Sequence, residues 1–289
     1  MSSEPRWVLV TGASTGIGRS CVEYLAKNGF KVYAGARKED DLAELGKIES
    51  VETVKLDVTE DDDVQAVKES IEAKGTGLYG LVNNAGIGIG GPLMDVTNEE
   101  MQQQIAVNLL GVHRVTRALF PFILKAKGRV VMMSSDSGRI AMPFLGPYTT
   151  TKFGLEGYAD TLREEMLLLG VKVILVEPGM IKTPIWDKSE LQLDKAKNRT
   201  ISVDLLVKLA LNMMPNFIKE GKTTGKDPIE VAKIVHEALT VKKPRDRYPV
   251  MDQPWKFKLG QLLGAKTIDK MVLKEFTKAM ASMNEPMPE

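Results

Sequence analysis

The sequence of 289 residues is poor in several features that mark particular protein classes. It contains one cysteine, Cys21, so no intramolecular disulfide can form, which fits a reducing compartment. We interpret Cys21 as a small apolar residue of an early helix, with a reactive thiol as the alternative. No run of about 18 uninterrupted apolar residues occurs, so no membrane-spanning helix is expected. The net charge of +1 lacks the basic excess typical of nucleic-acid-binding proteins.

Targeting signals and metal-ligand patterns are also missing. The first residues, MSSEPR, show no charged segment followed by a long apolar one, so a secretory signal is not expected. The last residues, MPE, match no common address signal, and a cytoplasmic location is predicted. No His, Cys or Asp cluster has the spacing of metal ligands, so no bound metal is predicted. His113 and His236 are expected to be partly buried polar residues without a catalytic role.

The chain does contain a regular alternation of short apolar segments and longer helical patterns. The short segments are rich in Val, Leu and Ile, as expected of strands that are buried on both faces. They predict strands at Trp7–Val10, Lys31–Gly35, Val51–Leu56, Gly80–Val82, Arg129–Met133 and Val171–Val176. Helices are predicted between them at Ile17–Asn28, Asp61–Ala73, Glu99–Leu124 and Thr150–Leu169. This order predicts an α/β fold, a Rossmann-like doubly wound parallel sheet, as a single domain over residues 1–289.

The pattern changes in the last third of the chain. Residues 187–226 show no clear strand and are predicted to form a helical substrate lid. A helix is predicted to start at Asp227, with Pro228 in its first position and Glu230 completing a capping box. A final strand over Arg247–Val250 contains Pro249, which indicates a sheet edge. Residues 251–289 form a C-terminal extension. Its helical part, 256–283, is expected to pack on the body or on another subunit, with a membrane surface as the alternative.

A glycine-rich segment follows the first predicted strand and opens the first predicted helix. Its three glycines, Gly12, Gly16 and Gly18, would permit a tight turn, a close approach of the backbone to a pyrophosphate, and close packing of helix on sheet. The N-terminus of that helix would present unpaired N–H groups to the anion. A plain strand–helix turn is the alternative for this segment taken alone.

Tyr148 and Lys152 are four residues apart at the start of a predicted helix, a spacing that places both on one face. An ammonium group beside a phenol favours the phenolate and lowers the pKa of the phenol. We therefore expect the pair to bring a proton-transfer group closer to working pH.

Taken together, five segments resemble the short-chain dehydrogenase/reductase family in order and spacing, specifically its branch of enzymes with about 250 residues. They are Thr11–Gly18, Asp57-Val58, the Asn83–Gly86 segment NNAG, a serine with Tyr148 and Lys152, and Pro178-Gly179. The similarity covers about residues 6–185 and, more loosely, residues 227–250. The core and the C-terminal extension are similar to family members that act on steroids, retinol or 3-hydroxybutyrate.

The resemblance assigns further residues. The family's catalytic serine lies thirteen residues before its tyrosine, which is Ser135 here, with Ser134 and Ser137 as alternatives. Asn108 matches a fourth catalytic residue, which interrupts a helix and holds a water near the lysine. Lys152 would also hold the nicotinamide ribose. Asp57 would contact the adenine, Asn84 the adenosine ribose, and Ile181 and Thr183 the carboxamide. The implied cofactor-binding residues are Gly12, Ser14, Thr15, Gly16, Ile17, Gly18, Arg37, Asp57, Val58, Asn84, Ala85, Gly86, Tyr148, Lys152, Pro178, Gly179, Ile181 and Thr183.

Cofactor preference is predicted from the end of the second strand. No acid stands there, and Arg37 and Lys38 follow at once. An arginine can bind a 2′-phosphate through two hydrogen bonds, so NADP(H) is predicted to be preferred over NAD(H). Alternatively, Arg37 pairs with the acids at 39–41 or belongs to a solvated charge run. Thr15, where many NADP users carry a second cation, is neutral.

The predicted function is hydride transfer between NADP(H) and a secondary alcohol or ketone, of steroid, retinoid or hydroxy-acid type and hydrophobic. Two alternatives keep the fold: a non-catalytic NAD(P)-binding sensor or scaffold, and an epimerase or dehydratase acting on nucleotide sugars. Members of the family often assemble through the helices that correspond to Glu99–Leu124 and Thr150–Leu169. A homodimer or homotetramer is therefore expected.

Overall fold

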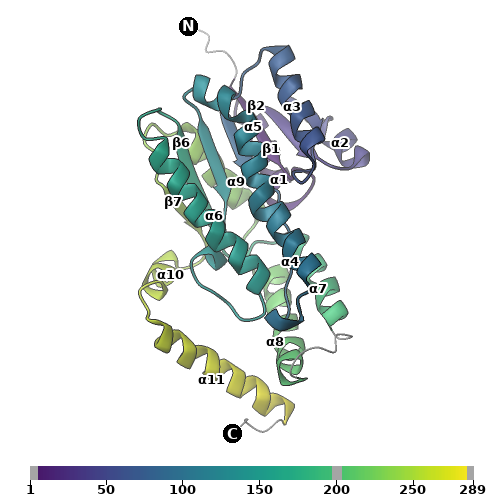
Figure 1. Cartoon of the computed structure of the whole chain (residues 1–289), viewed down its shortest axis with the longest axis vertical. Coiled ribbons are helices and arrows are strands. Elements are labelled where there is room, and N and C mark those ends of the chain that lie inside the picture. Colours follow the sequence, from purple (N-terminus) through teal and green to yellow (C-terminus); the bar gives the residue numbers. More distant parts are fainter. Residues whose placement is uncertain (1–5, 197–203, 285–289) are drawn as a thin grey trace.

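A computed structural model of the chain describes residues 6–196 and 204–284 and is built on one sheet (Figure 1). The seven strands lie in the order β3-β2-β1-β4-β5-β6-β7, and each neighbouring pair is parallel. Their bounds are β1 (Trp7–Thr11), β2 (Lys31–Ala36), β3 (Val51–Lys55), β4 (Gly80–Asn83), β5 (Arg129–Met133), β6 (Lys172–Pro178) and β7 (Arg247–Val250). All seven predicted strands are confirmed, because central strands covered on both faces must be apolar along their whole length.

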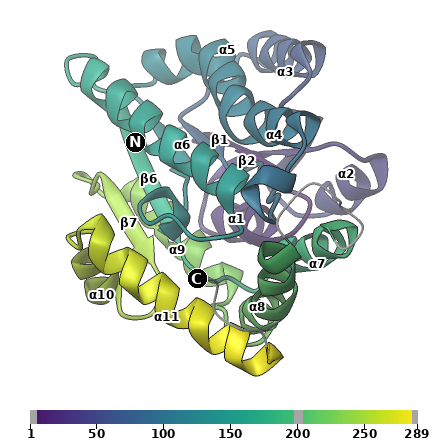
Figure 2. The same cartoon turned by 60° about the horizontal axis from the view of Figure 1, so that its bottom comes forward.

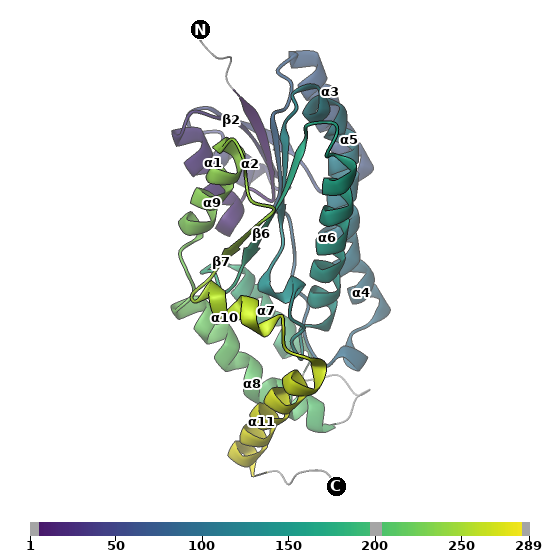
Figure 3. The same ribbon diagram turned by 90° about the vertical axis from the view of Figure 1, so that its left-hand side faces the viewer.

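Helices cover both faces of the sheet, as Figure 3 shows edge-on. One face carries α1 (Gly16–Lys27), α2 (Glu39–Leu45) and α9 (Pro228–Thr240), and the other carries α3 (Asp61–Lys74), α5 (Gly111–Lys125) and α6 (Gly146–Glu165). Each face has its own apolar core. Cys21 lies on α1 and is fully buried, and burial raises the pKa of its thiol to about 12. This agrees with a packing role and not with a reactive thiol.

The edge position of the last strand is also confirmed. β7 is the outermost strand beside β6, and Pro249 lies within it opposite Glu177. A proline has no N–H to donate, so an edge strand, with one side free of partners, tolerates it.

Three local expectations were wrong or incomplete. Residues 39–45 form helix α2, where no helix was predicted; three acids in its first turn face the positive end of the helix dipole. The single helix predicted over 99–124 is α4 (Asn98–Ile105), a π-helical turn (Ala106–Leu110) and α5. At the start of α9, the Asp227 carboxylate accepts from the Ile229 N–H as expected of a cap. The capping box does not form, because the Glu230 carboxylate binds the Lys233 ammonium instead.

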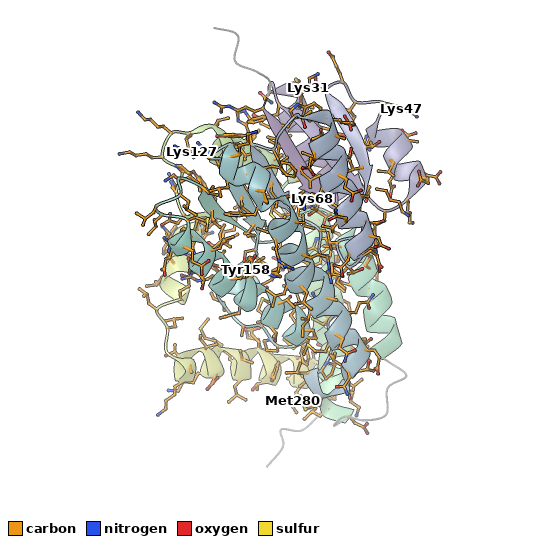
Figure 4. The ribbon with its side chains drawn as sticks, turned by 45° about the horizontal axis from the view of Figure 1, so that its top comes forward. Lys31, Lys47, Lys68, Lys127, Tyr158 and Met280 are labelled. Atoms are coloured by element: carbon orange, nitrogen blue, oxygen red, sulfur yellow. The ribbon has the colours of Figure 1, made fainter. Side chains whose placement is uncertain are left out.

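The C-terminal segments lie at the end of the sheet where the strands finish (Figures 1 and 2). They are α7 (Ile185–Ala196), α8 (Asp204–Thr223), α10 (Pro254–Gly260) and α11 (Ala265–Met283), with short 3-10 turns earlier at Leu93–Asp95 and Asp136–Gly138. Helix α11 packs on α8 in a third apolar cluster that includes Phe144, Leu209 and Met280, the last labelled in Figure 4. Residues 197–203 of the predicted lid and 285–289 of the extension lie outside the described residues. None of the described helices is long and apolar enough to cross a membrane.

Candidate active site

The loop between β1 and α1 has three positions, Gly12, Gly16 and Gly18, that only glycine fits. Gly12 and Gly16 have φ angles of +64° and +55°, in the left-handed region that disfavours side chains. A Cβ added to Gly18 would lie 2.1 Å from the carbonyl oxygen of Gly12. Without side chains at these positions, the backbone leaves a concave surface in front of the α1 N-terminus, where unpaired N–H groups can bind phosphate.

The NNAG segment after β4 braces this loop. The Asn84 amide donates to the carbonyl oxygens of Thr11 at 2.9 Å and Gly12 at 3.1 Å. The Thr11 hydroxyl in turn accepts from the backbone N–H groups of Asn84 and Ala85, both at 3.0 Å. Bracing of the central strands was expected, but the Asn84 side chain is engaged by the protein itself. Contact of Asn84 with a ribose stays a prediction.

A cavity of 410 Å³ opens at the carboxyl ends of the strands. It extends from the glycine loop and Arg37, past Asn84 and the strand ends, to helices α7 and α8. All predicted cofactor-binding residues line it, and so do Ser135, Tyr148 and Lys152. Asn108 does not line the cavity. The described residues thus bring three catalytic candidates, which come from β5 and α6, to the same cavity as the glycine loop. The cradle of glycines fits a dinucleotide.

Lys152 is placed by both its helix and its strand neighbours. Its ammonium lies 5.5 Å from the centre of the Tyr148 ring and donates to the carbonyl oxygen of Met133, at the end of β5, at 2.7 Å. The side chain is 6% exposed. Burial lowers the pKa of Lys152 to about 8, and the charge of Glu156 opposes that shift.

The pKa of Tyr148 differs from the expectation. Its pKa is raised to about 12. Burial raises the pKa most, the charge of Asp136 adds to this, and the hydrogen bond with Ser135 opposes it. Sequence reasoning considered only the neighbouring ammonium and predicted a lowered pKa. The desolvation of the phenolate in the cavity wall outweighs that attraction. At neutral pH Tyr148 is therefore a protonated phenol, which can donate a proton.

Ser135 has a partner that sequence reasoning missed. Its hydroxyl donates to the Asp136 carboxylate at 2.8 Å, and that carboxylate also accepts from the Ser137 N–H at 2.7 Å. Burial raises the pKa of Asp136. Of the alternatives, the Ser134 hydroxyl is buried without a hydrogen-bond partner, and the Ser137 hydroxyl donates to the Asp136 carboxylate. Ser135 is the serine whose hydrogen bond affects the pKa of Tyr148. An acid directly after a strand-end serine was the available signal.

Asn108 lies in the π-helical turn, as the resemblance implied. Its side-chain oxygen accepts from the Ile87 N–H and its amide donates to the Ile87 carbonyl, both at 2.9 Å. The same amide contacts the Thr151 hydroxyl at 3.3 Å, one residue before Lys152. Gln104 repeats the arrangement on the previous turn with Ile87 and Ile89. Both amides fix the loop after β4 against α6, and a bound water at Asn108 stays a prediction.

The end of β2 pairs with the end of β3. Arg37 reaches the Asp57 carboxylate at 3.4 Å, and its side chain is 64% exposed. The acids at 39–41 are not its partners, because they lie in the first turn of α2. Burial raises the pKa of Asp57, but hydrogen bonds from Thr59 and the charge of Arg37 together bring it below its ordinary value. Arg37 is thus at the cavity rim with most of its guanidinium open.

Helices α7 and α8 form the wall opposite the catalytic residues. The Trp186 indole donates to the carbonyl oxygen of Ile181 at 2.7 Å and packs edge-on against Phe217 at 5.6 Å. A Cβ on Gly221 would lie 2.2 Å from this indole, so α8 approaches α7 through the glycine. Met142, Leu145, Ile185, Trp186, Met214 and Phe217 give this end of the cavity an apolar lining. Among the described residues no group of His, Cys, Asp and Glu has a metal-binding arrangement.

Comparison with known proteins places this site in a family. The family model described as short chain dehydrogenase matches residues 6–194. The chain belongs to the short-chain dehydrogenase/reductase family. It is 35% identical to the mitochondrial D-beta-hydroxybutyrate dehydrogenase of Bos taurus over 86% of this chain and 77% of that protein. It is 34% identical to retinol dehydrogenase 5 of Mus musculus, over 92% and 87%.

A solved structure supports the same conclusion. The short-chain dehydrogenase from Streptomyces avermitilis superposes with a TM-score of 0.76 at 27% identity, over 97% of this chain and 99% of that one. The resemblance drawn from the sequence and the predicted fold class are therefore confirmed. This short-chain dehydrogenase/reductase is an NAD(P)-dependent oxidoreductase that acts on alcohol or ketone groups.

Proposed function

We propose that this oxidoreductase uses NADP(H) to reduce a hydrophobic ketone to a secondary alcohol, with Tyr148 as proton donor. One observation supports this most: a half-buried phenol with a raised pKa and Ser135 share one cavity with the glycine cradle and an apolar wall. The bound cofactor would supply the hydride. Steroid-like, retinoid-like and hydroxy-acid-like ketones are the candidate substrates.

Each protein group has a separate task in this proposal. The Tyr148 hydroxyl donates its proton to the carbonyl oxygen of the substrate, as a general acid. The Ser135 hydroxyl turns from Asp136 to donate a hydrogen bond to the same oxygen and stabilises its developing charge. Lys152 holds the nicotinamide ribose and contributes positive charge. Asn108 positions the loop after β4 and the α6 turn that carries Tyr148 and Lys152.

The remaining binding contacts follow the shape of the cavity. Arg37 would bind the 2′-phosphate at the rim, which is the basis of the proposed preference for NADP(H). The phosphates would lie on the loop from Gly12 to Gly18, with Thr15 beside them, and Thr183 would contact the carboxamide of the nicotinamide. Asp57 and Val58 would contact the adenine, and Pro178, Gly179 and Ile181 the nicotinamide. Residues 187–226 would act as a lid, and residues 251–289 as an extension of the same domain. A cytoplasmic homodimer or homotetramer remains our expectation.

A substrate panel tests the proposal. Purified protein is mixed with NADPH and ketones of increasing apolar area, and the absorbance of the reduced nicotinamide is followed. We expect turnover that increases with apolar area, and none with Tyr148→Phe run in parallel. Tight NADPH binding without turnover of any ketone, or of any alcohol with NADP⁺, would favour the sensor or scaffold. Nucleotide-sugar conversion without net cofactor oxidation would favour the epimerase.

A further inference from the structure

A cluster of charged side chains, built around two buried carboxylates, lies next to Lys152 and outside the cavity. Glu156 on α6 is 6% exposed and Glu177 on β6 is 3% exposed. Arg247 on β7 joins them: its Nε lies 3.1 Å from Glu156 Oε2 and 3.4 Å from Glu177 Oε1. Its Nη2 lies 2.5 Å from Asp160 Oδ2, and Arg139 approaches Glu156 at 3.8 Å. Burying two carboxylates side by side is costly, so we asked what these two could do besides packing.

The cluster is connected to the catalytic pair by the helix itself. Glu156 follows Lys152 by four residues on α6, so both side chains lie on one face of the helix. Both are 6% exposed, and both pack on the turn that ends at Gly138. There, an added Cβ would lie 3.2 Å from Glu156 Cγ and 3.2 Å from the Lys152 carbonyl oxygen. The other carboxylate oxygen of Glu156, Oε1, has no hydrogen-bond partner.

A lysine that is buried without a nearby negative charge loses its proton near neutral pH. We propose that Glu156 is a positioning residue of this enzyme: its buried carboxylate, which is paired with Arg247 and lies one helical turn after Lys152, holds Lys152 in the ammonium form. The inference rests on the proposed function, in which the charge of Lys152 serves cofactor binding and catalysis. It assigns a purpose to a buried carboxylate that touches neither substrate nor cofactor.

Besides Lys152, the charged groups around Glu156 are Arg139 after the 3-10 turn, Asp160 on α6, Glu177 on β6 and Arg247 on β7. Asp160 lies on the same helix and is shared with Arg163 at 3.6 Å. Burial and the charge of Glu156 raise the pKa of Glu177 to about 7, although Arg139 and Arg247 oppose this. Near neutral pH Glu177 is therefore partly protonated and competes only partly for Arg247. The shorter of the two Arg247 Nε contacts is the one to Glu156, at 3.1 Å, and Glu156 is one helical turn from Lys152.

The pH profile of kcat/KM provides the test, because it reports groups of the free enzyme. In the wild type the alkaline limb should fall near pH 8, where Lys152 loses its proton. Glu156→Gln keeps the shape and removes the charge. The limb should then move down by about one pH unit or more. Most activity should return at lower pH. Glu156→Asp, which restores the charge, should bring the limb most of the way back.

Two further variants make the test specific. Glu165→Gln removes an exposed acid from the same helix and should leave the limb in place. Arg139→Gln removes a cation that is 32% exposed and should shift the limb slightly upward, because the negative charge of Glu156 is then less compensated. The opposite sign distinguishes an electrostatic role from general loosening of the fold. It also keeps the test decisive if Glu156→Gln does not fold.

A readout that needs no turnover separates this inference from the proposed function. With ¹³Cε-labelled lysine, the Lys152 resonance is identified by its loss in Lys152→Arg, and its titration is compared in wild type, Glu156→Gln and Arg139→Gln. A downward shift in Glu156→Gln and an upward one in Arg139→Gln support the inference even if no ketone is reduced. An unchanged Lys152 titration in both variants overturns it, even if ketones are reduced.

Discussion

Tyr148 combines two properties that rarely occur together in a surface tyrosine. It is half-buried in the cavity wall, and its hydroxyl neighbours Ser135 and the half-buried carboxylate of Asp136. Enclosure raises the energy of the phenolate, so at neutral pH the group enters the reaction as an acid. A protonated phenol is the form that the proposed reduction of a ketone requires.

Removal of this hydroxyl gives the first prediction. In Tyr148→Phe, kcat for ketone reduction should fall by several orders of magnitude, because proton transfer and stabilisation of the oxyanion each contribute about 100-fold or more. The NADPH dissociation constant, measured by cofactor fluorescence, should change little. Tyr158→Phe is the matched control, since Tyr158 lies on the same helix and contacts His113 outside the cavity (Figure 4). Turnover within tenfold of wild type in Tyr148→Phe would refute the assignment.

Arg37 gives the second prediction. Its guanidinium is mostly exposed at the rim and only weakly paired with Asp57 at 3.4 Å, so it can turn to a phosphate. A hydrogen bond to a charged group is worth about 1.5–3 kcal/mol, so Arg37→Ala should raise the KM for NADPH by about 10-fold or more. The KM for NADH should stay near its wild-type value.

Lys38→Ala is the control for Arg37, because Lys38 is the next residue, exposed and outside the cavity lining. Catalytic efficiencies of the wild type with both cofactors decide the preference. Equal efficiencies, or a higher one with NADH, would show that Arg37 is a surface charge without a part in cofactor choice.

At the scale of elements, the sequence predicted what local patterns determine. The strands were found because burial on both faces demands continuous apolar runs. The glycine loop and the Tyr148–Lys152 spacing are local in sequence, so they too could be found. The Arg247–Glu156–Glu177 cluster joins β7, α6 and β6, and the Arg37–Asp57 pair joins two strand ends. Such pairings depend on tertiary placement, which periodicity does not report.

The two helical surprises have similar causes. Helix α2 is seven residues long and buries only Leu42 and Leu45, too little for a recognisable apolar stripe. The π-helical turn at Asn108 shifts the backbone hydrogen bonds of one turn, which leaves no mark in the apolar periodicity, so only the resemblance pointed to it. The raised pKa of Tyr148 was missed because it depends on enclosure by the whole cavity and not on the neighbour four residues away.

The α7–α8 wall gives the third prediction, on substrate binding. Trp186 joins the two helices through Ile181, Phe217 and Gly221, and presents apolar surface to the cavity. Trp186→Ala removes that surface, and a few kcal/mol of apolar contact corresponds to tenfold or more in affinity. The KM for a large apolar ketone should rise at least tenfold, with NADPH binding nearly unchanged.

Trp255→Ala is the matched control for Trp186→Ala, since Trp255 lies on α10, is 61% exposed and does not line the cavity. Steady-state kinetics with a small and a large ketone distinguish a role of Trp186 in substrate binding from a role in the stability of the fold. An equal loss with both ketones, accompanied by weaker NADPH binding, would contradict the lid.

At the scale of the whole molecule, the outer faces of the helices on the α5–α6 side carry apolar side chains that are exposed to solvent. Leu110, in the π-helical turn, is 51% exposed, and Phe153 on α6 is 44% exposed. Gly157, one turn after Phe153, has open space where a Cβ would be. Small and apolar residues on one exposed helical face allow the same face of a second copy to approach closely, and a two-fold axis would then pair each patch with itself.

The last prediction is therefore self-association through this face. Light scattering coupled to size exclusion should give two or four times the 31.8 kDa of one chain. Leu110→Asp with Phe153→Asp should reduce the mass to that of one chain, because charges without partners are costly in an apolar interface. Met271→Asp, which places an acid on the exposed surface of α11, should leave the mass unchanged. A wild-type mass of 31.8 kDa at micromolar concentration would contradict assembly, and an assembly that survives the double variant but not Met271→Asp would place the interface on α11.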